Sequence, residues 1–188
     1  MTDIFEVGGM YHIYTRAIGN EILFRNDDNY AYFIKKYCYY HDDKSDTLAF
    51  CLLPNHFHLL VNIKENSTNE LIVKGFSDFL NSYSKSYNKV FGRNGGLFQR
   101  KFKRKKIDTE EYLTRVVIYI HLNPVKHGLT KGSSEWKFSS YRSYLSKSQS
   151  KLNRELVLKW FGGLDGFITT HNSNTDLFLP EEFTLEKY

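Results

Sequence analysis

A short apolar stretch with two histidines constrains this chain more than any other part of it: Pro54-Asn55-His56-Phe57-His58-Leu59-Leu60-Val61. In an extended strand successive side chains point to opposite faces, so His56 and His58 share one face while Phe57 and Leu59 share the other. Two imidazoles on one side of a rigid strand can hold a divalent cation. Neighbouring histidines also occur on exposed strands or as hydrogen-bonded groups beside a core. The pair alone therefore leaves both interpretations open.

Alternating and helical patterns around this stretch predict the fold. Strands are expected at 11–16, 47–53, 56–63 and 97–106, and helices at about 27–41, 68–91 and 110–123. Pro124 is expected to end the third helix. This order predicts an α+β protein with a split β-α-β layout, in which helices pack on one face of an antiparallel sheet. A smaller extension with short helices and an acidic tail is expected beyond Gly128.

The charge of the chain is unevenly distributed. The net charge is +5. Residues 163–188 hold five acids and one lysine, a net of −4, so residues 1–162 carry +9. A basic body favours an anionic partner such as nucleic acid, and the 14 Tyr and 15 Phe residues offer flat faces for unstacked bases.

The cysteine content and the hydropathy of the sequence indicate the cellular compartment of the protein. The two cysteines, Cys38 and Cys51, form no disulfide framework and fit a reducing compartment. The sequence has no apolar run long enough to span a bilayer and no signal-peptide pattern. We expect a cytoplasmic protein associated with the nucleoid, without a membrane partner.

The segment 97–106 turns strongly basic along its length. Its cations are Arg100, Lys101, Lys103, Arg104, Lys105 and Lys106. Lysines on a sheet edge often serve only to prevent aggregation. Beside a metal site, the same residues would form a track for phosphates. Arg16, on the same strand face as His12 and Tyr14, is a further candidate contact to the DNA backbone.

The third helix carries the remaining candidates for chemistry. At about 100° per residue, Tyr112, Arg115, Tyr119 and Asn123 fall on one helix face. Tyr119 and Asn123 are one turn apart, so a phenol and an amide could both face a cation held by the histidines. Tyr119 could equally be one packed tyrosine among fourteen, with Tyr112 as its competitor. Asn123 could be only a helix-terminal residue.

A phenolate beside a cation is a competent nucleophile for a phosphodiester. Its attack would leave a phosphotyrosine that conserves the energy of the broken bond, so that the strand could be rejoined without ATP. The metal would act as a Lewis acid on the scissile phosphate, while Arg115 or the lysine-rich strand neutralised charge.

Several sequence blocks, in a fixed order, resemble a known family. They are Leu53-Pro54-Asn55-His56-Phe57-His58-Leu59-Leu60-Val61, Gly96-Leu97-Phe98-Gln99-Arg100, Tyr119-Ile120-His121-Leu122-Asn123-Pro124-Val125-Lys126-His127-Gly128-Leu129 and Trp136-Lys137-Phe138-Ser139-Ser140-Tyr141. With these blocks the chain, over roughly 11–144, resembles the single-tyrosine HUH transposases, in particular the REP-associated tyrosine transposase branch of the insertion-sequence single-strand transposases.

The resemblance implies a ferredoxin-like (RRM-like) catalytic domain in residues 1–130, with an extension in 131–188. It implies Mg²⁺ or Mn²⁺ as cofactor, His56 and His58 as metal ligands, and Tyr119 as nucleophile. Asn123 would be the third ligand, although the better-known insertion-sequence enzymes carry a glutamine there. The charge pattern, rather than the resemblance, predicts DNA contacts at Arg16, Arg100, Lys101, Lys103, Arg104, Lys105 and Arg115. Family members work as monomers or as homodimers, and the sequence leaves both open.

The function expected from this resemblance is a metal-dependent endonuclease and transposase. It would cleave and rejoin single-stranded DNA at hairpin-flanked repeats through a 5′-phosphotyrosine. The alternative is a domesticated regulator that binds hairpin DNA or RNA without chemistry. A covalent adduct on a hairpin oligonucleotide distinguishes the two.

Overall fold

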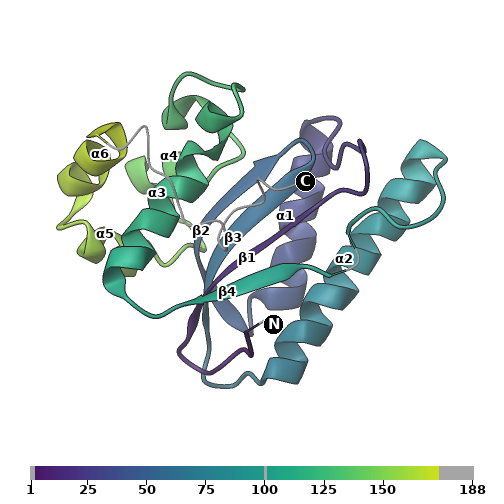
Figure 1. Cartoon of the computed structure of the whole chain (residues 1–188), viewed down its shortest axis with the longest axis horizontal. Coiled ribbons are helices and arrows are strands. Elements are labelled where there is room, and N and C mark those ends of the chain that lie inside the picture. Colours follow the sequence, from purple (N-terminus) through teal and green to yellow (C-terminus); the bar gives the residue numbers. More distant parts are fainter. Residues whose placement is uncertain (1–2, 100, 174–188) are drawn as a thin grey trace.

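A computed structural model describes residues 3–99 and 101–173 of the chain. Four antiparallel strands form one sheet in the order β2-β3-β1-β4 (Figure 1). The strands are β1 (Met10–Arg16), β2 (Ser45–Leu53), β3 (His56–Ile63) and β4 (Lys103–Ile107). The helices are α1 (Asp27–His41), α2 (Asn69–Phe91), α3 (Glu110–Lys126), the 3₁₀ turn η1 (Ser133–Glu135), α4 (Tyr141–Leu145), α5 (Arg154–Trp160) and α6 (Leu164–Ser173). The predicted α+β class, antiparallel sheet and C-terminal helices are confirmed.

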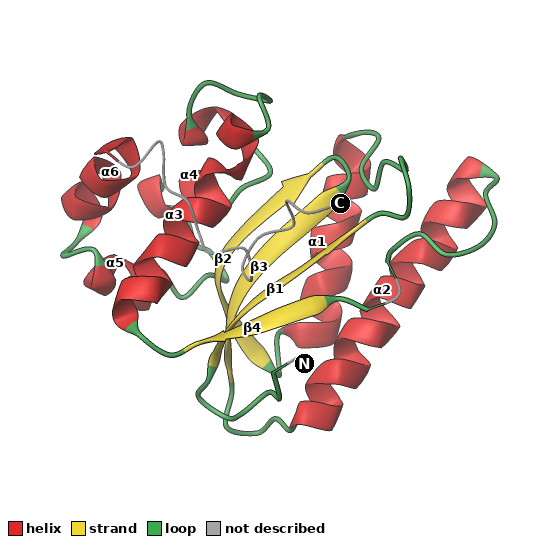
Figure 2. Ribbon diagram, in the orientation of Figure 1, coloured by secondary structure: helices red, strands yellow, loops and turns green. Residues whose placement is uncertain are grey.

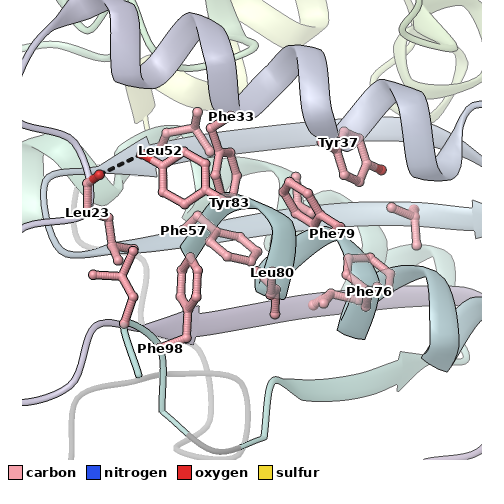
Figure 3. Close-up of a cluster of buried hydrophobic side chains, with 14 of the residues drawn as sticks. Leu23, Phe33, Tyr37, Leu52, Phe57, Phe76, Phe79, Leu80, Tyr83 and Phe98 are labelled. Atoms are coloured by element: carbon pink, nitrogen blue, oxygen red, sulfur yellow. Dashed lines mark hydrogen bonds between the residues drawn. The ribbon is translucent and has the colours of Figure 1, made fainter. Parts of the chain in front are cut away.

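The first core lies between one face of the sheet and helices α1 and α2. Tyr11 and Ile13 of β1 and Phe57, Leu59 and Val61 of β3 are buried in it, as their alternation predicted. The helices contribute mainly aromatic side chains, including Phe33, Tyr37, Phe76, Phe79 and Tyr83 (Figure 3). The Tyr83 hydroxyl donates a hydrogen bond of 2.7 Å to the Leu23 carbonyl, which satisfies the one polar atom of that ring.

The third helix does not share this face, and the expectation of helices on one face is wrong for α3. Figure 2 shows α1 and α2 on one side of the sheet and α3 with the C-terminal helices on the other. Cys51 and Leu53 of β2 and Leu60 of β3 form a second core with Val116 and Ile120 of α3. The reason is that the strand around 48–53 is apolar on both faces, so each face needs a cover. His56 and His58 therefore point toward α3.

Helix boundaries follow local sequence signals. Asn26, Thr68 and Thr109 cap α1, α2 and α3, and each side chain accepts a backbone N–H hydrogen bond. Gly92 ends α2 in the left-handed region at φ 61°. Pro124 does not end α3, which continues to Lys126. Proline lacks the N–H donor that a helix needs at this position, but α3 continues for only two residues beyond Pro124. His127 N then bonds the Asn123 carbonyl at the end of the helix.

The expected fourth strand is divided. β4 covers only Lys103–Ile107, whereas Phe98 pairs with Ala17 through an isolated bridge and Gln99 N bonds the Arg16 carbonyl. Both parts lie along the β1 side of the sheet.

The C-terminal extension covers the opposite edge of the sheet. Leu52 N bonds the Phe138 carbonyl and Ser140 N bonds the Phe50 carbonyl, so 138–140 run beside β2. Tyr141, Tyr144 and Phe167 join the second core. The division into 1–130 and 131–188 stays a prediction, and the acidic tail lies outside the described residues from 174 onward. No described helix has both the length and the apolar character needed to cross a membrane.

Candidate active site

The two histidines of β3 are held in a buried position between the sheet and α3. His56 is 6% exposed and His58 is 0% exposed. Across the sheet, Arg16 pairs with His56 and Tyr14 pairs with His58. Tyr14 in turn pairs with Lys103 of β4. The strand register thus sets the histidines beside two cations and an aromatic ring on one sheet face.

Hydrogen bonds orient both imidazoles. His56 Nδ1 lies 2.7 Å from Asn55 Oδ1, which can only accept, so Nδ1 carries the proton and Nε2 carries a lone pair. His58 Nδ1 lies 3.0 Å from His12 Nε2. The Nε2 atoms of His56 and His58 are buried and have no hydrogen-bond partner among the described residues. Two imidazole nitrogens are therefore left for a ligand.

Burial keeps these imidazoles neutral. Desolvation lowers the pKa of His56 to about 3, with contributions from the charges of His127 and Arg16. Desolvation also lowers the pKa of His58 well below its ordinary value, and that of His12 to about 3. A neutral imidazole is the form that binds a metal ion.

Helix α3 brings Tyr119 against His58 and His12. The Tyr119 ring packs edge-on against His58, with ring centroids 5.5 Å apart and an interplanar angle of 88°. It also contacts His12 at 6.0 Å, and Lys126 Nζ lies 5.0 Å from the Tyr119 ring centroid. Tyr119 is 1% exposed. The competitor Tyr112 lies about two turns earlier, half-buried at the start of α3, with Arg115 over its ring at 6.0 Å.

Asn123 occupies the next turn of α3 and completes the group. Its side chain is buried, and Nδ2 donates a 2.9 Å hydrogen bond to the Tyr119 carbonyl. Because Nδ2 is engaged in this bond, Oδ1 is the atom of the amide that could coordinate a cation. Asn123 also lies close to His56 and raises the pKa of that histidine, which partly offsets the desolvation.

The site offers nitrogen and oxygen donors to a divalent cation. Within the described ranges, no group of three His, Cys, Asp or Glu side chains is arranged to hold a metal. The available donors are two orphaned imidazole nitrogens and one amide oxygen. Mg²⁺ and Mn²⁺ commonly take few protein ligands and complete their shell with water and substrate phosphates, so the set fits such an ion. The ligand roles of His56, His58 and Asn123 stay predictions.

The predicted DNA contacts divide between the two sheet faces. Lys103 lies on the histidine face, where its Nζ is 6.0 Å from the Tyr14 ring centroid, and Tyr14 stacks on His58 at 5.8 Å. Lys105 pairs with His12 and shares that face. Arg104 faces the opposite way, over the Phe5 ring at 4.6 Å, and donates to the Asp3 carbonyl.

The other predicted contacts are more remote. Arg115 is exposed and forms a 2.8 Å ion pair with Glu111 one turn earlier on α3. Lys101 is exposed. Arg100 lies outside the described residues.

Sequence reasoning missed four residues around the histidine pair. His12 contacts both His58 and Tyr119, Asn55 orients His56, Lys126 lies over Tyr119, and His127 packs against His56 with centroids 4.9 Å apart. The alternation of β1 placed His12 on the correct face, but the register that brings it to His58 is not readable from one sequence.

The chain is similar to known proteins in sequence and in fold. No protein-family model matches the sequence. A protein of Haemophilus influenzae that carries the provisional name REP-associated tyrosine transposase is 33% identical over 103 residues, covering 51% of this chain and 58% of that protein. The REP-associated tyrosine transposase of Escherichia coli K12 is 29% identical over 93 residues, covering 50% of this chain and 52% of that protein. The match therefore spans just over half the length of each curated relative.

A solved structure extends the similarity in fold. It is described as a REP-associated tyrosine transposase bound to a REP hairpin, and it superposes with a TM-score of 0.64 over 78% of this chain and 85% of that chain. At 21% identity this likeness establishes the fold. The chain is thus related to the REP-associated tyrosine transposases, in sequence over about half of its length and in fold over most of it.

Proposed function

We propose that this protein is a metal-dependent enzyme that cleaves and rejoins single-stranded DNA beside hairpins, with Tyr119 as nucleophile. The observation that carries the proposal is the contact between Tyr119 and His58, at 5.5 Å between ring centroids. The two side chains come from α3 and β3, and only the fold brings them together. A phenol packed against an imidazole whose Nε2 has no hydrogen-bond partner among the described residues is an arrangement suited to phosphodiester chemistry.

Tyr119 attacks the scissile phosphorus through its phenolic oxygen. The phenol gives up its proton to water, and a new O–P bond forms to the tyrosine while the bond from phosphorus to the 3′-oxygen breaks. The 3′-oxygen takes a proton from water and leaves as a 3′-hydroxyl. The product is a 5′-phosphotyrosine. In the reverse step a 3′-hydroxyl attacks the same phosphorus and releases the phenol, so strands are joined without another energy source. Lys126, 5.0 Å from the Tyr119 ring, favours the negative phenolate electrostatically.

His56, His58 and Asn123 Oδ1 would hold a Mg²⁺ or Mn²⁺ ion. When bound, the ion supplies Lewis-acid activation of the phosphate and helps to align it for in-line attack. The chain itself supplies neutral imidazoles, because burial lowers the pKa of both histidines. It also fixes the His56 proton on Nδ1 through Asn55.

The basic residues on the histidine face would bind the DNA backbone. Arg16 pairs with His56, and Lys103 and Lys105 lie along β4 on the same face. Their charges can neutralise phosphates that lead toward Tyr119. The solved relative contains a REP hairpin, and this supports a hairpin as the nucleic-acid partner. Because Tyr119 is only 1% exposed, the chain around its hydroxyl has to open before a phosphate can reach it.

The test is the formation of a covalent adduct. The protein is incubated with Mn²⁺ and a panel of single-stranded oligonucleotides that carry hairpins with unpaired flanks, and adducts are resolved by denaturing electrophoresis. We expect an adduct that Tyr119→Phe and EDTA abolish. Tyr112→Phe is the matched control, because it removes a hydroxyl from the same helix about two turns away, and it should form adduct normally.

Two outcomes contradict the proposal. An adduct that persists in Tyr119→Phe but disappears in Tyr112→Phe would assign the nucleophile to the other tyrosine. Tight, strongly salt-dependent hairpin binding without any adduct across the panel would instead identify a non-catalytic binding protein.

A further inference from the structure

We propose that His12 is a positioning residue that holds His58 in the tautomer able to bind the cation. His12 belongs to β1, has no assigned role, and is 0% exposed. Its Nε2 lies 3.0 Å from His58 Nδ1, and the two rings are nearly parallel at 20° with centroids 5.1 Å apart. The inference rests on the proposed function, because it concerns the same metal site.

The hydrogen bond between the two rings allows only two arrangements of protons. If His12 donates, His58 keeps its own proton on Nε2, and that nitrogen cannot bind a metal. If His58 donates from Nδ1, its Nε2 carries the lone pair, and His12 accepts through Nε2. Only the second arrangement fits a cation at His58. Metal-ligating histidines generally donate their other N–H to a fixed acceptor in this way.

No other described group takes the place of His12. His12 Nε2 is the hydrogen-bond partner of His58 Nδ1, and both rings are shielded from bulk water. His12 is itself held between Tyr14, 4.8 Å away, and Tyr119, 6.0 Å away. Its ring therefore packs against both a proposed ligand and the proposed nucleophile. The acceptor is a neutral imidazole rather than a carboxylate, so it orients His58 without adding negative charge to the site.

Two substitutions distinguish the role of His12 as a hydrogen-bond acceptor from its role in packing. His12→Phe keeps a flat ring but removes the acceptor nitrogen. His12→Gln keeps an acceptor, Oε1, near the position of Nε2. Mn²⁺ binding to the metal-free full-length protein is measured by calorimetry at one neutral pH, without DNA. We expect His12→Phe to weaken Mn²⁺ binding about 10- to 100-fold, in the range found for such supporting partners, and His12→Gln to restore most of it.

His41→Phe is the matched control. His41 is also a buried histidine, 1% exposed, but it lies among Tyr37 and Phe76 in the core on the opposite sheet face. Its replacement should leave Mn²⁺ affinity unchanged. Thermal unfolding of each variant separates a folding defect from a loss at the site.

A second measurement needs no variant of His12. In the Mg²⁺-loaded wild-type protein, ¹⁵N spectra of the imidazoles should place the His58 proton on Nδ1. A proton on His58 Nε2 would overturn the proposal, as would a His12→Phe protein that binds Mn²⁺ like wild type. If the wild-type protein binds no Mn²⁺ at all, the proposed metal-dependent function fails, and the role of His12 fails with it. The two failures are thus distinguishable.

Discussion

Asn55 Oδ1 accepts a 2.7 Å hydrogen bond from Nδ1 of the adjacent His56. Asn55 lies in the tight connection between β2 and β3, directly before the strand that carries both histidines. Because the acceptor fixes the His56 proton on Nδ1, it also determines that Nε2 faces the site with a lone pair. The turn thus contributes to the site through the side chain of one of its residues.

Replacing Asn55 with leucine should weaken metal binding. Without the acceptor, His56 can place its proton on Nε2 and rotate away from the productive orientation. We expect Mn²⁺ affinity to fall about 10-fold or more in Asn55→Leu, measured by calorimetry. Asn55→Asp retains an acceptor and should bind at least as tightly as wild type. Equal affinities in the wild type and Asn55→Leu would show that the hydrogen bond does not govern His56.

Alternate residues of β4 should differ in their effect on DNA binding. Lys105 shares the histidine face, whereas Lys106 faces away and forms a 2.7 Å ion pair with Glu6. If DNA follows the histidine face, Lys105→Ala should lower hairpin affinity and reduce the slope of log K against log salt by about 1. Lys106→Ala, the control from the same strand, should leave the slope unchanged. Fluorescence anisotropy at several salt concentrations measures both.

The opposite result would place the bound DNA on the other face of the sheet. If Lys106→Ala reduced the salt slope and Lys105→Ala did not, the nucleic acid would lie over the face that carries Arg104. That face is packed by Phe5 and the residues around Asp3.

Much of the fold was readable from local patterns. The alternation of β1 and β3 identified the residues of the first core, and the helices expected at about 27–41 and 68–91 are confirmed as α1 and α2. These signals work because they depend on neighbours in sequence. The position of α3 depends instead on which apolar face of the sheet is still uncovered, and this could not be read from the helix itself. The apolar character of Cys51 and Leu60 on the histidine face was the available signal.

In the site, too, spacing within one strand or helix could be predicted from the sequence, whereas contacts between separate elements could not. Spacing predicted that His56 and His58 share a face and that Tyr119 and Asn123 share a helix face, and the structure brings all four together. His12 was missed because its role depends on the β1–β3 register, which pairs Tyr14 with His58. Charge alone also failed to separate Arg104 from its neighbours, because the strand period assigns them to opposite faces only after the strand boundaries are known.

Gly166 should be difficult to replace. A Cβ atom at this position would lie 1.9 Å from the Phe161 carbonyl oxygen, which belongs to the turn between α5 and α6. Gly166→Ala must therefore displace backbone, and we expect the free energy of unfolding to fall by about 1–3 kcal/mol. Gly132→Ala is the control, because its Cβ would meet only the Glu135 side chain at 3.8 Å. Urea unfolding measures both, and equal stabilities would show that the α5–α6 turn tolerates a side chain.

His41 should make the protein less stable in acid. Desolvation lowers its pKa to about 3, aided by Lys44 and opposed by Asp43 and Asp42, whereas an unfolded chain has a histidine pKa near 6.5. Between these two values the unfolded state binds a proton that the folded state does not. Stability is therefore retained above pH 6.5 and is lost as the pH falls toward 3, by about 1.4 kcal/mol per pH unit for this one group. His41→Phe removes the titrating imidazole. Between pH 7 and pH 5, the free energy of unfolding of this variant, measured by urea titration, should therefore fall less than that of the wild type. Parallel losses in the two proteins would mean that His41 is charged in the folded state despite being 1% exposed.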